Sequence, residues 1–263
     1  MLDSDIGLEE LLAKARAGGE LPPVPEAEPA LGDAYAIQRA VFARGGAPIA
    51  GWKIGLTAEP PRIALGANSP AAGRLAAADI LAGGSEIEFS GAEMYAEAEL
   101  VVELARDLPS AGAPYSREAV AAAIGSVRAG IEIVRSRFAE TGLPLGLLVA
   151  DNVMAHALVV GEPMSQGWQD GYADMGAVLE RLGEERVEGS TTRVMGDPLN
   201  ALVWLANWLC EQDGGLKAGQ LVATGTCTGA TEIHGGDTVV VQLGDLGKVQ
   251  VSITNSAIEG DKK

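Results

Sequence analysis

Two glutamates separated by a single residue are the clearest candidates for chemistry in this sequence. In the segment 95–104, small and apolar residues alternate with Glu97, Glu99 and Glu103. If the segment is a strand, Glu97 and Glu99 share one face and lie about 7 Å apart along it. Two ionised carboxylates that close repel each other, and a hard cation such as Mg²⁺, which prefers oxygen ligands, relieves the repulsion. The strand interpretation therefore predicts a metal site.

The same segment also fits a helix. Leu100, Leu104 and Leu108 recur every four residues, and a helix would turn the glutamates toward solvent. Charged side chains are mostly exposed in proteins. The local pattern alone therefore favours a solvated face over a set of metal ligands, and the decision depends on residues elsewhere in the chain.

Two isolated charges outside this segment bear on the decision. Glu132 is the only charge in the β-branched run 131–134, where an unpaired carboxylate is costly, so it needs Arg135, Arg137 or a metal ion as a partner. Lys53 lies in the apolar segment 49–57 before a glycine-rich turn. The local sequence favours an ordinary solvent-facing lysine. The functional alternative is a desolvated lysine with a lowered pKa, suited to proton transfer.

Other kinds of catalytic machinery are absent from the sequence. It has no phosphate-binding loop, no dinucleotide fingerprint and no nucleophile elbow. Its histidines, His156 and His234, are too few for a histidine-rich metal site, and His156 is interpreted as a core residue. The chemistry that remains is that of carboxylates, one or two lysines and a hard metal.

Composition narrows the class of protein. The 263 residues are 47% hydrophobic and carry a net charge of −17, which repels phosphate backbones and anionic membranes. We therefore expect neither a nucleic-acid nor a membrane partner, and an anionic substrate would need a local positive centre. The only cysteines are Cys210 and Cys227, and the first residues show no signal-peptide pattern, so we expect a cytoplasmic protein.

Apolar periodicity and turn signals predict the elements that carry these residues. Helices are expected over 4–17, 33–44, 116–128 and 198–213, with Asp33, Ser116 and Asp197 as N-caps. Residues 58–92 are expected to be mostly turns. Strands are expected over 49–57, 131–134, a hairpin in 176–192, and 221–226, 231–234, 238–243 and 248–254. We expect one domain over 1–263, with a helix and proline-rich linker in 1–30, a core in 31–257 and a polar tail in 258–263.

Taken in order, several motifs resemble the fumarylacetoacetate hydrolase superfamily. The motifs are Gly-Trp-Lys-Ile-Gly-Leu-Thr at 51–57, Glu-x-Glu at 97–99, Ile-Glu-Ile-Val-x-Ser-Arg at 131–137, Asp-Asn at 151–152 and Thr-Gly-Thr at 224–226. Within that superfamily the sequence resembles the 2-keto-4-pentenoate hydratases and the 4-oxalocrotonate decarboxylases. The resemblance extends from about residue 35 to the C-terminal strands.

The resemblance implies an α+β fold, a β-rich mixed roll or sandwich with peripheral helices, that assembles as a homo-oligomer, a dimer or larger. It implies that Glu97, Glu99 and Glu132 hold Mg²⁺ or Mn²⁺ and that Lys53 acts in proton transfer. It also implies that substrate, a small 2-oxo acid, is bound by Leu65, Asp151, Asn152, Gly225 and Thr226.

The implied activity is hydration of a 2-hydroxydienoate or 2-oxo-enoate. Two segments depart from the hydratase pattern: Pro-Ala-Ala-Gly at 70–73 lacks the usual acid at Ala71, and Val-Met-Ala-His at 153–156 replaces small hydroxyl residues. The first departure strengthens the alternative of a 2-oxohex-3-enedioate (4-oxalocrotonate) decarboxylase. An acylpyruvate C–C hydrolase and a catalytically inactive metal-binding subunit are further alternatives.

Overall fold

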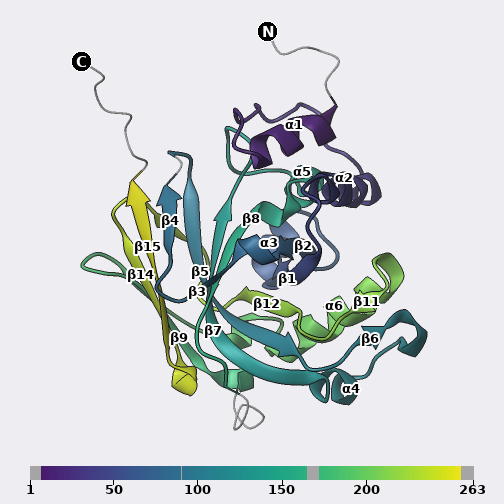
Figure 1. Cartoon of the computed structure of the whole chain (residues 1–263), viewed down its shortest axis with the longest axis vertical. Coiled ribbons are helices and arrows are strands. Elements are labelled where there is room, and N and C mark those ends of the chain that lie inside the picture. Colours follow the sequence, from purple (N-terminus) through teal and green to yellow (C-terminus); the bar gives the residue numbers. More distant parts are fainter. Residues whose placement is uncertain (1–6, 90, 165–171, 256–263) are drawn as a thin grey trace.

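The chain builds two main β-sheets with helices at their edges (Figure 1). The computed structural model describes residues 7–89, 91–164 and 172–255. The larger sheet has the order β2-β1-β12-β5-β7-β8-β3, and β13 also pairs with β5. Its strands are β1 (Ile49–Gly55), β2 (Ala71–Ala76), β3 (Ile80–Ala82), β5 (Met94–Leu104), β7 (Ile124–Arg135), β8 (Ala155–Val160), β12 (Leu221–Thr226) and β13 (Thr231–Ile233).

The second sheet packs against one face of the long strands β5 and β7. It has the order β10-β9-β14-β15-β4, and a separate two-stranded sheet pairs β11 with β6. Ala96, Ala98 and Leu100 of β5 are fully buried, and they belong to the same core cluster as Val239 and Val241 of β14. The strands are β4 (Glu86–Phe89), β6 (Leu108–Pro109), β9 (Gly176–Arg181), β10 (Arg186–Ser190), β11 (Gly215–Leu216), β14 (Thr238–Leu243) and β15 (Lys248–Asn255).

The helices fall into two groups. α1, α2 and α5 bury a second apolar cluster that includes Leu12, Tyr35 and Leu147, whereas α4 and α6 lie together at the other end of the larger sheet (Figure 1). Within the described residues, no helix combines the length and the apolar character needed to cross a bilayer. The helices are α1 (Leu8–Arg16), α2 (Leu31–Arg44), α3 (Glu59–Ala64), α4 (Arg117–Ala121), α5 (Leu145–Ala150) and α6 (Pro198–Gln212).

The predicted α+β class is confirmed, as are the hairpin of β9 and β10 and the four C-terminal strands β12–β15. Asp197 caps α6 as predicted, since its carboxylate accepts a hydrogen bond from the Leu199 amide at 2.8 Å. Residues 4–6 of the first predicted helix and the tail 258–263 lie outside the described residues.

Three predictions of local structure were wrong. The helix predicted over 116–128 is only α4, capped by Ser116, because residues from Ile124 onward pair with β5 along its whole length and this pairing overrides alanine helix propensity. α2 begins at Leu31 with Ala30 as its N-cap, so Asp33 lies in the first turn. The glycine- and proline-rich segment 58–92 contains α3, β2, β3 and β4 besides turns.

Candidate active site

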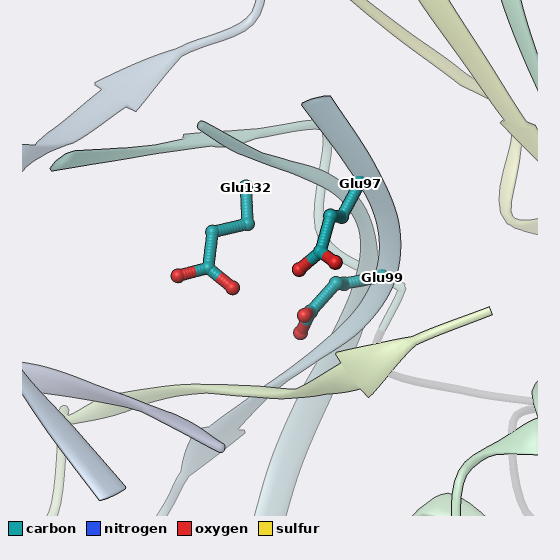
Figure 2. A group of neighbouring side chains, drawn as sticks. All are labelled: Glu97, Glu99 and Glu132. Atoms are coloured by element: carbon teal, nitrogen blue, oxygen red, sulfur yellow. The ribbon is translucent and has the colours of Figure 1, made fainter. Parts of the chain in front are cut away.

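The register between β5 and β7 brings the three predicted glutamates together. Glu97 lies directly opposite Glu132, and Glu99 lies opposite Gly130. The strand interpretation of segment 95–104 is therefore correct, with Glu97 and Glu99 on the face opposite to the buried Ala98. One carboxylate oxygen from each glutamate lies within 4.8 Å of the others, and Figure 2 shows the three groups converging.

The glutamates occupy an environment that disfavours free carboxylates. Glu99 and Glu132 are 0% and 1% exposed, and Glu97 borders a cavity. Burial and the charge of Glu132 raise the pKa of Glu97 to about 7. Burial, followed by the charges of Glu132 and Glu97, raises the pKa of Glu99 well above its ordinary value. Clustering these acids is therefore costly unless positive charge compensates for them.

The donor set fits a divalent cation. Glu99 Oε1 and Glu132 Oε2 are buried and accept no hydrogen bond from the described residues. Buried polar atoms without partners are rare in native proteins and need an explanation, such as an ion. Oxygens bound to one Mg²⁺ or Ca²⁺ at roughly 2.0–2.6 Å lie at most roughly 4–5 Å apart, which matches the spacing of this cluster. Glu97, Glu99 and Glu132 would hold the ion.

Glu99 is fixed by its second oxygen. Oε2 accepts a hydrogen bond from the Gly225 amide at 2.8 Å, next to an irregularity in the pairing of β12 with β5. Gly225 has φ +128°, and a Cβ there would lie 2.4 Å from Thr57 Oγ1. Only glycine fits this position without displacing its neighbours. Gly130, opposite Glu99, is similarly confined, since a Cβ there would lie 2.4 Å from Val101 Cγ2.

Lys53 projects from the centre of β1 to the same cluster. Its side chain is 3% exposed, and Nζ lies 3.0 Å from Glu132 Oε1. The solvent-facing interpretation of Lys53 was therefore wrong, and Lys53, rather than Arg135 or Arg137, is the basic partner of Glu132. Gly73 of β2 pairs with Lys53, and a Cβ there would lie 2.6 Å from the Asn152 carbonyl oxygen and 2.9 Å from Lys53 Cγ. The absence of a side chain at Gly73 thus makes room for the lysine.

The protonation of Lys53 reflects two opposing effects. Burial, the largest effect, lowers its pKa, but the charges of Glu132, Glu97 and Glu99 together outweigh burial and raise it. The lowered pKa that was predicted from the sequence therefore does not hold for the metal-free protein. If a bound cation compensated the three carboxylate charges, their effect on the pKa of Lys53 would disappear, and burial alone would lower that pKa.

A cavity of about 370 Å³ opens beside the glutamates and the lysine. Glu97, Lys53 and Thr226 lie on its wall, which places Thr226 where a substrate contact was predicted. Gly225 does not line the cavity, and it acts on the site through its hydrogen bond to Glu99. Most of the remaining wall is apolar and includes Leu56, Pro61, Tyr95, Val134, Val153 and Met154.

Sequence reasoning missed Tyr95 and Val134. Both were available from the period-two pattern of the strands: Tyr95 precedes Glu97 by two residues and Val134 follows Glu132 by two, so each shares its neighbour's face. In the ladder, Tyr95 and Val134 lie directly opposite each other.

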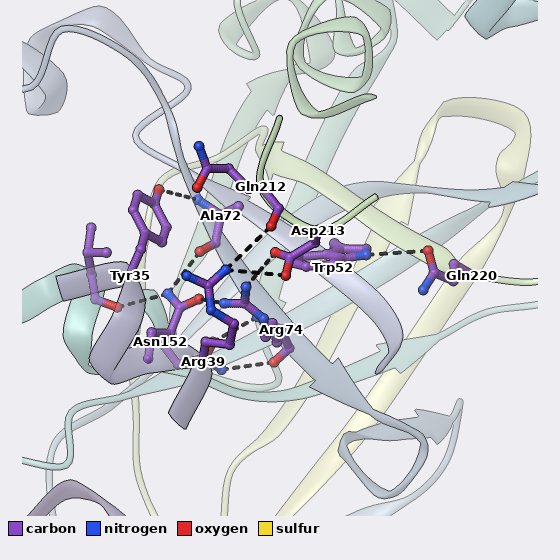
Figure 3. A network of polar contacts seen from close by, with 11 residues as sticks. Tyr35, Arg39, Trp52, Ala72, Arg74, Asn152, Gln212, Asp213 and Gln220 are labelled. Atoms are coloured by element: carbon purple, nitrogen blue, oxygen red, sulfur yellow. Dashed lines mark hydrogen bonds and ion pairs between the residues drawn. The ribbon is translucent and has the colours of Figure 1, made fainter. Parts of the chain in front are cut away.

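The structure does not place Asp151 and Asn152 on this cavity. Asp151 Oδ2 accepts a hydrogen bond from the Arg137 amide at 3.0 Å, and burial raises the pKa of Asp151 to about 6. The Asn152 side chain forms a two-way bridge to the backbone of Arg74 in β2: Oδ1 accepts from the amide at 2.7 Å and Nδ2 donates to the carbonyl at 2.8 Å (Figure 3). Both residues hold the chain that follows α5 in place.

That chain is strained where it meets the cavity. Asn152, Val153 and Met154 have φ values of +56°, +54° and +59°. Such values are outliers for a β-branched residue, and strained backbone clusters at functional sites. Val153 and Met154 both line the cavity, so the bridge made by Asn152 fixes the conformation that presents them. Asn152 is therefore a positioning residue in this geometry.

Two other residues singled out from the sequence lie elsewhere. Leu65 follows α3 and packs against the second apolar cluster rather than lining the cavity. His156 of β8 borders a different cavity, of about 320 Å³, together with Arg135 and Arg137. Burial and the charge of Arg137 lower the pKa of His156 to about 3, so the side chain is neutral. The structure therefore places His156 apart from the glutamate cluster.

Comparisons with known proteins agree with this geometry. The family model for the C-terminal region of fumarylacetoacetate (FAA) hydrolase matches residues 68–254. A 2-keto-4-pentenoate hydratase of Dechloromonas aromatica strain RCB is 34% identical over 82% of this chain and 83% of its own length. A 4-oxalocrotonate decarboxylase of Pseudomonas putida is 29% identical over 82% of this chain and 83% of its own length.

A solved structure is also similar over almost the whole chain. It is 4-oxalocrotonate decarboxylase from Pseudomonas putida G7, complexed with magnesium and adipate. The two structures superimpose with a TM-score of 0.83 at 28% sequence identity, covering 95% of this chain and 100% of the other. The similarity therefore includes the strands that carry the three glutamates and Lys53.

Proposed function

Because this chain belongs to the fumarylacetoacetate hydrolase family, we propose that it is a divalent-metal-dependent lyase that hydrates a 2-hydroxydienoate or 2-oxo-enoate. One observation carries the proposal. Three clustered glutamates, with carboxylate oxygens that lack hydrogen-bond partners among the described residues, lie beside a buried lysine at the edge of a cavity. This arrangement combines a cation site with a proton-transfer group.

Mg²⁺ or Mn²⁺ is the proposed ion, held by Glu97, Glu99 and Glu132. When bound, it would supply Lewis-acid stabilisation for the negative charge that develops on the oxygen at C2 of the substrate. Related structures are complexed with magnesium or calcium, which supports a divalent ion that accepts oxygen ligands.

The residues of the chain supply orientation and proton movement. Lys53 Nζ is the group placed to donate and accept the proton that moves between enol and keto forms, because it is buried at the cavity wall and already 3.0 Å from a carboxylate. Glu132 orients the ammonium group. Thr226 offers a hydroxyl on the wall for the substrate, and most of the remaining wall is apolar.

Decarboxylation of 2-oxohex-3-enedioate is the second candidate, and Ala71 favours it. Ala71 is 2% exposed and pairs with Gly55, a residue of the cavity wall. The acid expected at this position in a hydratase is therefore missing close to the proposed site. Both reactions use the same stabilised enolate, so relatives of both kinds are compatible with this geometry.

One assay separates the candidates. The purified protein is incubated with Mg²⁺ and either 2-hydroxypenta-2,4-dienoate or 2-oxohex-3-enedioate, and both ultraviolet absorbance and CO₂ release are followed. We expect Mg²⁺-dependent loss of the dienoate absorbance, abolished by EDTA and restored by added Mg²⁺. CO₂ release from the diacid alone would identify the decarboxylase. Inactivity with both compounds would instead favour an acylpyruvate hydrolase or an inactive metal-binding subunit.

We further propose that the chain works as one catalytic domain in the cytoplasm, within a homo-oligomer that is a dimer or larger. The resemblance to the superfamily, which implies a homo-oligomer, and the cysteine content support these expectations. Light scattering of the purified protein measures the oligomer, and a monomeric mass would contradict it.

A further inference from the structure

The face of β5 and β7 that carries the metal-site glutamates continues into the cavity. Tyr95 and Val134 form the next pair on this face after Glu97 and Glu132, about 7 Å farther along the strands at the usual rise per residue. Both side chains line the cavity. A ligand anchored at the glutamate cluster and extending along the cavity therefore passes Tyr95 and Val134 with its far end.

Among the residues that the structure describes, no basic side chain lines this far end of the cavity. Among the described residues that line the cavity, Lys53 is the one basic side chain, and it lies at the glutamates. Arg62 is close in sequence to Leu56 and Thr57 of the wall and donates to the carbonyls of these residues at 3.2 and 3.3 Å, but it does not line the cavity itself. Among the described side chains that line the cavity, a second carboxylate on a ligand would therefore find no basic partner apart from Lys53.

Two acidic side chains flank Tyr95 at the far end. The Tyr95 hydroxyl donates to Glu93 Oε2 at 2.9 Å, and Glu232 of β13 lies directly opposite Tyr95 in the ladder. These two carboxylates disfavour an anion at this end, because like-charge contact is a means of rejecting a ligand.

The cavity is also larger than the simplest substrate requires. Its 370 Å³ equals the volume of about twelve water molecules at about 30 Å³ each. A five-carbon hydroxydienoate has about eight non-hydrogen atoms and lies well below the drug-sized ligands that fill pockets of about 300–1,000 Å³. The space beyond the reacting carbons is lined by apolar groups such as Val134, Val153 and Met154.

We propose that this cavity selects a substrate with a single carboxylate, bound at the glutamate cluster, and an uncharged apolar tail longer than a vinyl group, bound between Tyr95 and Val134. The inference rests on the proposed function. It favours hydration of a monoacid over decarboxylation of a diacid, since the diacid would place its second carboxylate beside Glu93 and Glu232.

The test uses three unreactive 2-oxo acids and calorimetric titration of the full-length, Mg²⁺-loaded protein. Pyruvate reports on the chelating end alone, whereas 2-oxohexanoate and 2-oxoadipate have equal chain length and differ in the terminal carboxylate. We expect 2-oxohexanoate to bind at least tenfold more tightly than 2-oxoadipate, and more tightly than pyruvate. Equal or tighter binding of 2-oxoadipate, with pyruvate still binding, would overturn the inference and leave the proposed function standing. Failure of pyruvate to bind in a Mg²⁺-dependent way would overturn both.

Variants at the far end test the location of the tail. Val134→Arg adds a cation there, and Val134→Met is the uncharged control of similar length. We expect Val134→Arg to shift the ratio of affinities at least tenfold toward 2-oxoadipate, and Val134→Met to leave the ratio within twofold of the wild type.

A surface variant covers the case in which Val134→Arg does not fold. Glu93 is exposed, so Glu93→Gln removes one acidic charge without disturbing the core. We expect it to reduce the preference for 2-oxohexanoate two- to threefold. An unchanged ratio in both Val134→Arg and Glu93→Gln, in folded proteins, would show that the tail lies elsewhere and would overturn the inference.

Discussion

Glu97→Gln tests the electrostatic description of the metal site without reference to catalysis. The pKa of Glu97 rises from the ordinary 4.5 to about 7, which corresponds to about 3 kcal/mol of lost stability once the group is ionised. This is an upper value, because Glu97 borders an open cavity. The cost is absent below pH 4.5, where the carboxyl is protonated in both folded and unfolded protein. It grows as pH rises and is complete above pH 7.

The metal-free variant should therefore be more stable than the metal-free wild type at pH 8, and equal to it near pH 4.5. For a chain of this size, about 3 kcal/mol corresponds to a melting temperature up to about 6–12 °C higher. Mg²⁺ should instead stabilise the wild type more than the variant. At one hundred times its Kd, Mg²⁺ adds about 2.7 kcal/mol to the free energy of unfolding of the wild type, and it should add little to that of the variant.

Thermal denaturation of the variant and the wild type, each in EDTA and in Mg²⁺ and at pH 4.5 and pH 8, measures both effects. Glu103→Gln is the matched control, because Glu103 lies on the same face of β5 but forms an ion pair with Arg128 outside the cluster. We expect it to be neutral or slightly destabilising and to keep the full Mg²⁺ response. The reasoning fails if Glu97→Gln is less stable than the wild type at pH 8 in EDTA, or if its Mg²⁺ response matches that of the wild type.

Three further predictions concern neighbouring residues. Lys53→Met should retain Mg²⁺-induced stabilisation but lose turnover at least a hundredfold, because the cation site stays while the proton-transfer group is lost; turnover above a tenth of the wild type would remove Lys53 from the mechanism. Gly225→Ala should weaken Mg²⁺ binding at least tenfold in calorimetry, since its Cβ would meet Thr57 Oγ1 at 2.4 Å and shift the amide that holds Glu99. Asn152→Ala should lower the free energy of unfolding in urea by about 1–3 kcal/mol through loss of its buried backbone bridge, and an unchanged urea midpoint would contradict that role.

The sequence was informative about this site where local pattern and burial coincide. Interpreted as a strand, the alternation around Glu97 and Glu99 placed both on one face, although the local pattern alone favoured a solvated face. The isolation of Glu132 in a β-branched run predicted a carboxylate in need of an arginine or a metal ion. The identity of its basic partner was not predictable, because the contact with Lys53 depends on three strand pairings that join distant segments.

One error of local structure had the same physical origin. The alanine-rich segment after Ser116 has helix propensity, but its second half pairs with β5, and tertiary pairing prevailed. The assignment of Asp151 and Asn152 to the substrate stays a prediction, and in this fold their side chains bond to backbone groups. A motif identifies residues near a site, but hydrogen bonding in the fold determines whether a side chain faces the ligand or supports the wall.

Three glycines delimit the active site by the space they leave. Gly73 leaves room for Lys53, Gly130 lies opposite Glu99, and Gly225 brings an amide to the same carboxylate. None of the three would take part in the chemistry. A relative that keeps every acid and the lysine but has lost one of these glycines would be classified as active by its ligand residues and yet have a deformed site. For members of this family, inferring activity from sequence therefore requires checking these small positions as well as the charged ones.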